Sequence, residues 1–215
     1  MTSFMDSLCR RQCEQAARQT LIQCFTAINA SSDPILNQNA SITADKFTVI
    51  GTTQPHYDNF CNNRQRLFSC VSPLSNTCPS LLERLYTIGL DLKAMESATD
   101  ILCAHRGLYF HALQCFSNKP PAVTSCGPNT KASMQRVRSE RYQTGEILPS
   151  QYMDELCGVK LDQMYCELRG YEQSCNSEII ELRRSVECAS LPAPCHIDAQ
   201  SVPIYRAMCQ NLEGS

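Results

Sequence analysis

The chain has 215 residues, 19 basic and 21 acidic, and a formal net charge of −2, and this length suits one large domain or two small ones. A charge this close to zero argues against a protein that wraps nucleic acid or lies on an anionic membrane. No apolar run approaches the roughly 20 residues of a membrane span, and we expect the numbering to begin after a removed signal segment.

An amphipathic helix is predicted for residues 1–28. Its apolar side chains recur at steps of three and four residues, which places them along one face of a helix. Cys9 and Cys13 are four residues apart on this face. We therefore expect them to bond to different partners and not to each other.

Residues 29–54 interrupt this periodicity and are predicted to form a loop, with a short strand over 46–50. The loop holds two N-glycosylation sequons, whose acceptor residues are Asn29 and Asn39. Glycans at these two residues would keep this side of the molecule clear of other proteins.

Three further helices are predicted in the middle of the chain. Pro55 begins the first, over 55–71, because proline is favoured in a first helical turn. After a turn, the second helix covers 79–95. The third carries apolar side chains at helical spacing over 98–116.

The second half opens with a predicted break over 118–130, which contains three prolines and a glycine, followed by a basic connector over 131–149. Later helices are predicted to begin near Pro149, Ile179 and Val202. The segment LPAPCHID separates the last two of these helices. The apolar stripe of the middle one includes Arg183. No set of alternating strands is present, so the predicted fold class is all-α.

A repeated cysteine pattern relates the two halves of the chain. Cys61 and Cys70 are separated by eight residues, as are Cys157 and Cys166, and a third cysteine follows each pair. On a helix, two such cysteines lie about 14 Å apart along the axis, whereas the Cα atoms of a disulfide lie within about 7 Å of each other. Each cysteine must therefore bond to a neighbouring element.

We predict a disulfide-rich helical bundle of two related helical modules plus an N-terminal helix. The predicted divisions are an N-terminal helix and glycosylated loop over 1–55, a first module over 56–130, the basic connector over 131–149 and a second module over 150–215.

The fifteen cysteines predict a disulfide framework and hence an oxidising compartment. Metal binding is the alternative, but metal sites usually contain close Cys-x-x-Cys pairs, and none occurs here. An odd number leaves one cysteine unpaired or bonded to another chain, as in a disulfide-linked homodimer. The candidate disulfide cysteines are Cys9, Cys13, Cys24, Cys61, Cys70, Cys78, Cys103, Cys115, Cys126, Cys157, Cys166, Cys175, Cys188, Cys195 and Cys209.

The run FCNNRQRLFSC, followed by NTCPSLLERL and by Cys103 and Cys115, resembles secreted cysteine-rich helical domains of nematodes, including the chondroitin-proteoglycan type. The spacing Cys-x8-Cys-x7-Cys is also similar to that of the amino-terminal domain of repulsive guidance molecules and, more loosely, to modules of the GDNF receptor alpha family. The resemblance covers residues 57–116, with a weaker repeat over 152–209. It implies extracellular binding without catalysis. The chain departs from the proteoglycan pattern because it has no Ser-Gly dipeptide for glycosaminoglycan attachment.

No cluster of residues predicts a reaction. His105 and His111 are six residues apart, whereas a helical metal pair prefers a spacing of four. His196 and Asp198 could form a dyad, but the Cys-Cys-x-x-His-Asp helix and glycine-rich calcium loop of secreted phospholipases are missing. We therefore predict no enzyme activity, no cofactor and no metal.

The basic run KASMQRVRSER, over 131–141, is either a solvated connector or a contact for a sulfated glycan or another anion. The candidate contact residues are Lys131, Arg136, Arg138 and Arg141. Tyr142 and Tyr171 are predicted to be exposed aromatic residues that contact a protein partner.

Together these features predict a secreted extracellular binding or adhesion protein, or a receptor–ligand component, whose partner is an extracellular protein or a matrix glycan. A rigid disulfide frame favours this role because a preorganised surface loses less entropy on binding. The alternative is a secreted carrier of a small hydrophobic ligand, such as a lipid or fatty acid, in an apolar cavity between helices. Hydrophobic periodicity cannot distinguish a filled core from such a cavity.

Overall fold

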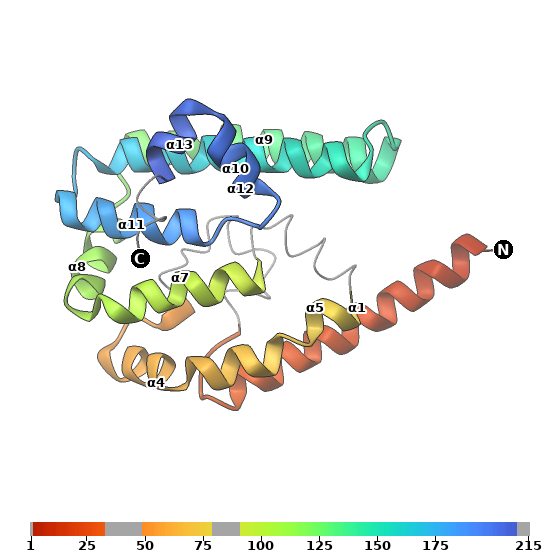
Figure 1. The fold of residues 1–215 in the computed structure, drawn as a ribbon, viewed down its shortest axis with the longest axis horizontal. Coiled ribbons are helices and arrows are strands. Elements are labelled where there is room, and N and C mark those ends of the chain that lie inside the picture. The colour runs from red at the N-terminus through yellow and green to blue at the C-terminus, as the bar shows by residue number, and fades with distance from the viewer. Residues whose placement is uncertain (1, 33–48, 79–90, 210–215) are drawn as a thin grey trace. The chain divides into compact units, whose positions relative to one another are not determined.

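The structure is a computed structural model that describes residues 2–32, 49–78 and 91–209. Within these ranges every regular element is a helix, which confirms the predicted all-α class (Figure 1). The helices are α1 (Thr2–Thr26), α4 (Gln54–Val71), α5 (Leu74–Thr77), α7 (Leu92–Ala104), α8 (Arg106–Ser117), α9 (Pro121–Ser139), the π-helix η1 (Glu140–Thr144), α10 (Pro149–Tyr171), α11 (Ser177–Ala189), α12 (Cys195–Ser201) and α13 (Pro203–Cys209).

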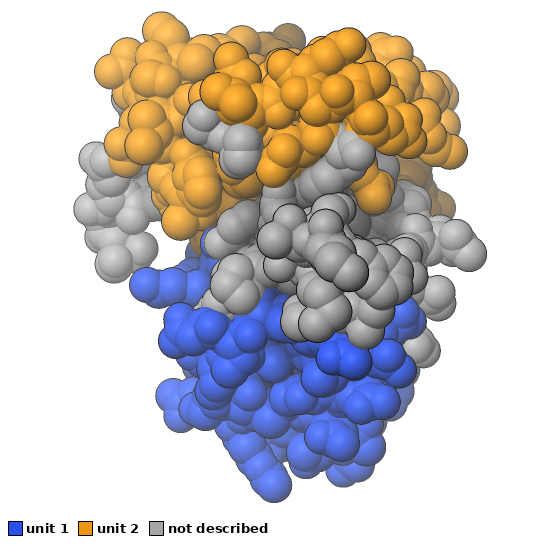
Figure 2. Space-filling model, turned by 90° about the vertical axis from the view of Figure 1, so that its right-hand side faces the viewer, with its two compact units in different colours: residues 1–103 blue, residues 104–215 orange. Residues whose placement is uncertain are grey.

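The chain divides into two compact units, residues 1–103 and 104–215 (Figure 2). The division falls at the end of α7 and not within the predicted connector over 131–149, which lies inside the second unit. The prediction of one helix over 98–116 is wrong, because His105 leaves the helical conformation, with φ −108° and ψ 45°, and separates α7 from α8.

Seven disulfides join the fourteen cysteines whose side chains the structure describes. The pairs are Cys13–Cys78, Cys24–Cys70, Cys61–Cys103, Cys115–Cys175, Cys126–Cys166, Cys157–Cys195 and Cys188–Cys209. Each bridge lies within one of the two units. Cys9 belongs to the part of α1 whose side chains are not described, so a disulfide to a second chain stays a prediction.

The two units share one order of disulfides. Six cysteines, taken along the chain, pair first with fifth, second with fourth and third with sixth. They are 13, 24, 61, 70, 78 and 103 in unit 1, and 115, 126, 157, 166, 175 and 195 in unit 2. The repeat noticed in the sequence therefore extends over both units. Cys195, and not the nearer Cys188, corresponds to Cys103, and α1 with its two bridged cysteines belongs to the first module.

In unit 1, α1 and α4 pack against each other. Leu21 and Phe25 of α1 are four residues apart, Phe60 and Leu67 of α4 are seven apart, and all four side chains are buried. Spacings of three, four and seven residues place these side chains on one face of each helix, as the periodicity predicted. The Cys24–Cys70 disulfide fastens the two helices together.

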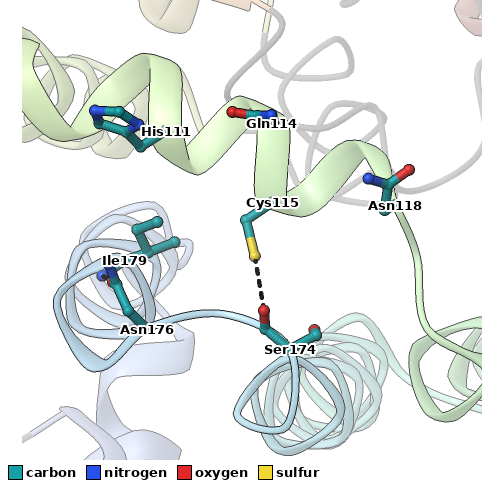
Figure 3. A pocket seen from close by; sticks show the side chains of 7 residues that line it. All are labelled: His111, Gln114, Cys115, Asn118, Ser174, Asn176 and Ile179. Atoms are coloured by element: carbon teal, nitrogen blue, oxygen red, sulfur yellow. Dashed lines mark hydrogen bonds between the residues drawn. The ribbon is translucent and has the colours of Figure 1, made fainter.

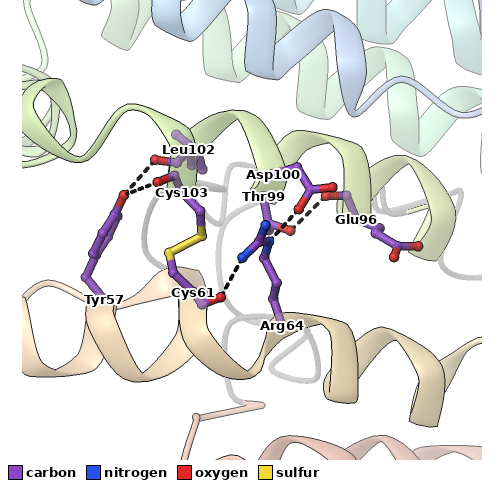
Figure 4. A network of polar contacts seen from close by, with 8 residues as sticks. All are labelled: Tyr57, Cys61, Arg64, Glu96, Thr99, Asp100, Leu102 and Cys103. Atoms are coloured by element: carbon purple, nitrogen blue, oxygen red, sulfur yellow. Dashed lines mark hydrogen bonds and ion pairs between the residues drawn. A yellow bond between two sulfur atoms is a disulfide. The ribbon is translucent and has the colours of Figure 1, made fainter.

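A second connection in unit 1 holds the end of α7 against α4 (Figure 4). Besides the Cys61–Cys103 disulfide, the Tyr57 hydroxyl lies 2.9 Å from the carbonyl oxygens of both Leu102 and Cys103 and donates to them. These carbonyls belong to the last turn of α7, where backbone acceptors lack helical donors. Tyr57 is 2% exposed, so its hydroxyl supplies hydrogen bonds that water cannot readily replace.

Replacing Tyr57 with phenylalanine should lower the free energy of unfolding by about 1–2 kcal/mol, because the buried carbonyl oxygen of Leu102 and the partly buried one of Cys103 lose their donor. The measurement is denaturant unfolding with all disulfides intact. Tyr165→Phe is the matched control, because the Tyr165 hydroxyl only accepts a long hydrogen bond of 3.5 Å from Arg169 at the surface. Equal losses in the two variants would contradict a special role for Tyr57.

In unit 2, helix α9 occupies most of the segment that was predicted to be a break and a basic connector, so that prediction is wrong. Pro121 lies in the first turn, where proline is favoured, whereas Pro128 lies inside the helix and removes one backbone hydrogen bond. Packing against α10 and the Cys126–Cys166 disulfide compensate for this loss. The buried side chains of α9 recur at steps of three and four residues, and they are Val123, Cys126, Thr130, Met134 and Val137.

Two short segments also differ from their predictions. The predicted strand over 46–50 ends in Val49 and Ile50, which are helical and buried, while 46–48 lie outside the described residues. The segment LPAPCHID was predicted to be an interruption, but α12 begins within it at Cys195. There, Cys157–Cys195 joins the short helix to α10.

Of the helix predicted over 79–95, the structure describes only residues 91–95. Asp91 caps α7, because its Oδ1 accepts hydrogen bonds from the backbone N–H groups of Lys93 and Ala94 at 2.9 and 3.3 Å. Residues 79–90 of that prediction lie outside the described residues.

Candidate functional site

An open hollow lies on unit 2, between the end of α8 and the start of α11 (Figure 3). Its volume is about 370 Å³, at the lower end of the roughly 300–1,000 Å³ typical of small-molecule sites. One side of its lining comes from α8 and the residue after it, and the other from the segment before α11 and the first turn of α11. The lining side chains are His111, Gln114, Cys115, Asn118, Ser174, Asn176 and Ile179.

A disulfide and a hydrogen bond fix the two sides of the hollow. Cys115–Cys175 joins α8 covalently to the segment before α11. Figure 3 shows Cys115 reaching toward Ser174, whose carbonyl oxygen lies 3.6 Å from Cys115 Sγ. The Tyr171 hydroxyl donates to the carbonyl oxygen of Phe116 at 3.3 Å. The hollow is therefore shaped by the fold before any ligand arrives.

Tyr171 was predicted to be an exposed contact residue, and this is wrong. Its side chain is 1% exposed, and its ring packs edge-on against Phe116, with the ring centroids 4.9 Å apart. Tyr171 supports the wall of the hollow and does not meet a partner. The side chain of Tyr142 lies outside the described part of the structure.

A buried arginine stacks on these two rings. The Arg183 guanidinium carbon lies 4.6 Å from the centroid of Phe116. Its Nη2 is 2.9 Å from Glu167 Oε2 and 3.4 Å from Glu187 Oε1, and Gln163 donates to the other oxygen of Glu167 at 2.8 Å. Ion pairs and cation–π contacts thus explain how an arginine occupies the buried stripe of α11.

The start of α11 is capped within the protein. Asn176 Oδ1 accepts a hydrogen bond from the backbone N–H of Ile179 at 2.8 Å. Glu178 lies in the first turn, where its carboxylate interacts favourably with the positive end of the helix dipole. The described lining contains no Asp, Glu, Lys or Arg, so neutral hydrogen-bonding groups dominate the hollow.

The basic residues predicted as anion contacts do not line the hollow. They lie on or beside α9 and are Lys131, Arg136, Arg138 and Arg141. Arg136 forms ion pairs with Glu140 and Glu155, each at 2.9 Å. The hydrogen bond that Arg136 donates to Glu140, and to a smaller extent the one it donates to Glu155, raises the pKa of Arg136. Arg141 is partly buried, and the other two are exposed. Carboxylates therefore compensate part of the positive charge of this run, and an anion contact there stays a prediction.

The histidines take part in separate contacts. His111 lines the hollow, while His196 Nε2 lies 3.1 Å from the carbonyl oxygen of Leu191. Among the side chains that the structure describes, no group of three or more His, Cys, Asp or Glu residues is placed to hold a metal ion. Among the described helices, none combines the length and the hydrophobicity needed to cross a bilayer.

One of the two predicted glycosylation sites lies in the described residues. Asn29 is exposed and adopts a positive φ of 52°, which asparagine tolerates better than most residues. It follows α1 in a Schellman arrangement, in which the N–H of Ala30 donates to the carbonyl oxygen of Phe25 at 2.9 Å. Its side chain is thus accessible to a glycosylating enzyme. Asn39 lies outside the described residues.

Sequence reasoning did not find Gln114, Asn118 and Asn176. Each is a polar residue on the exposed face of its segment, and nothing in the local pattern distinguishes it from other surface residues. The Cys115–Cys175 bridge joins the two segments covalently, and pairings among fifteen cysteines cannot be derived from spacing alone.

No protein-family model matches the chain, and no curated protein or solved structure shows significant similarity to it. The resemblance to nematode-type cysteine-rich helical domains therefore stays a prediction.

Proposed function

We propose that this chain is a secreted extracellular binding protein, which recognises a partner and does not catalyse a reaction. Two features support its passage through the secretory pathway. Seven disulfides are typical of proteins from oxidising compartments, and the sequon at Asn29 is exposed.

The observation that carries the proposal is the disulfide-braced hollow on unit 2. Its lining comes from two segments that Cys115–Cys175 joins, and Tyr171 supports it from within. A surface fixed in this way loses little conformational entropy when a partner binds. The proposed partner is an extracellular protein or a matrix glycan.

A carrier of a hydrophobic ligand has less support. Such a carrier needs an enclosed cavity lined mainly by apolar side chains. The described hollow is open, and most of its lining side chains are polar.

Expression in a secreting eukaryotic host tests the proposal. We expect the protein in the medium, with seven disulfides by mass spectrometry under non-reducing conditions. Labelled protein should bind saturably to extracellular matrix from the source tissue. Ser31→Ala should remove the glycan from Asn29 without changing the residue that adopts the positive φ. An apolar cargo that is released only on denaturation would contradict the proposal and favour the carrier.

A further inference from the structure

We infer that the hollow between α8 and α11 binds a neutral sugar residue, such as the terminal unit of an unsulfated glycan. The inference rests on the proposed function, because it names the class of ligand that the proposed binding site takes.

Amide side chains supply the hydrogen bonds. Gln114 of α8 and Asn118, which directly follows α8, line one side of the hollow, and Asn176 lines the opposite side. An amide presents an NH2 donor beside a carbonyl acceptor, and sugar hydroxyls both donate and accept. Neighbouring hydroxyls of one ring can therefore satisfy both atoms of one amide. Because the Asn176 oxygen already caps α11, its NH2 group is the part that can donate to a ligand.

An apolar surface completes the site. Ile179 is 5% exposed and still contributes to the lining, beside Cys115 of the disulfide. A sugar ring is polar around its edge and carries C–H groups on its faces. The amides can meet the hydroxyls while Ile179 packs against the C–H groups.

Other ligand classes fit the lining less well. Phosphate and sulfate groups are usually held by Arg, by Lys or by an uncapped helix N-terminus. The described lining contains no Arg and no Lys, and Asn176 already caps α11. Peptides are usually recognised along a sheet edge or an extended groove. From His111 to Asn118, the α8 wall is only about 10 Å long at 1.5 Å per residue.

The first test is a titration followed by NMR, with ¹³C-labelled isoleucine methyl groups. The probes are glucose, galactose, mannose, N-acetylglucosamine and N-acetylgalactosamine, with N-acetylglucosamine 6-sulfate and inorganic sulfate as charged comparators. We expect the Ile179 methyl signal to shift saturably with at least one neutral sugar. Ile180 is the internal control, because it is equally buried and does not belong to the lining.

The second test compares two double variants. Gln114→Ala with Asn118→Ala should weaken binding of the responsive sugar about tenfold or more, since hydrogen bonds from both amides are lost. The matched control is Asn129→Ala with Gln135→Ala, which removes two exposed amides from α9 and should leave affinity unchanged. Equal affinity of the two double variants would overturn the inference. So would tighter binding of the sulfated probe, or an Ile179 signal that no neutral sugar moves.

Matrix binding separates this inference from the proposed function. If free sugar or the Gln114/Asn118 variant abolishes binding to matrix, the inference is supported. If matrix binding persists unchanged in that variant and no sugar moves Ile179, the sugar site is refuted while the proposed function stands with a protein partner. If the protein binds neither matrix nor sugar, both proposals fail.

Discussion

Replacing Arg183 with methionine is expected to lower the free energy of unfolding by about 3–5 kcal/mol, because buried carboxylates then lose their cation. The side chains of Glu167 and Glu187 are only 11% and 15% exposed, and both lie within ion-pair distance of the arginine. Methionine also loses the cation–π contacts with Phe116 and Tyr171. The measurement is denaturant unfolding under non-reducing conditions.

The adjacent residue provides the control. Arg184 also forms ion pairs, with Glu181 and Glu172, but its side chain is 28% exposed. Solvent screens such pairs, so Arg184→Met should change stability by no more than about 1 kcal/mol. Adding Glu167→Leu to Arg183→Met should cost less than the sum of the two single losses, because the double variant removes both members of the Arg183–Glu167 pair. A loss at Arg183 no larger than that at Arg184 would contradict the importance of the buried cluster.

Hydrophobic periodicity predicted the helical class and several helices because their buried faces repeat every three or four residues. Geometry also predicted that Cys61 and Cys70 would not pair with each other and that each would bond to a neighbouring element. They pair with Cys103 on α7 and with Cys24 on α1. Both inferences depend only on distances along one helix, which a sequence determines directly.

Helix α9 was missed because its signals conflict. Gly127 and Pro128 are local helix breakers, whereas the buried stripe continues through them. Packing against α10 and the Cys126–Cys166 bridge stabilise the helical conformation despite these breakers. Neither contact can be predicted from the sequence until the disulfide pairing is known. The hollow was missed for the same reason, since Cys115 and Cys175 are 60 residues apart.

Removing the Cys126–Cys166 disulfide, with both cysteines changed to alanine, should destabilise unit 2 by about 4 kcal/mol. The chain-entropy estimate gives this value for the loop that the bridge closes, whose ends are 40 residues apart. Because α9 contains Pro128, it depends on this attachment to α10 more than an uninterrupted helix would.

The location of the loss tests the two-unit architecture. No described disulfide joins the two units to each other. In the variant without Cys126–Cys166, the backbone amides of α9 and α10 should therefore exchange with solvent up to about a thousandfold faster. The amides of α1 and α4 should keep their protection. Removing the counterpart Cys24–Cys70, whose ends are 46 residues apart, should give the reverse pattern. If either variant loosened both units equally, the units would unfold as one, and the repeated disulfide order would describe a single cooperative fold.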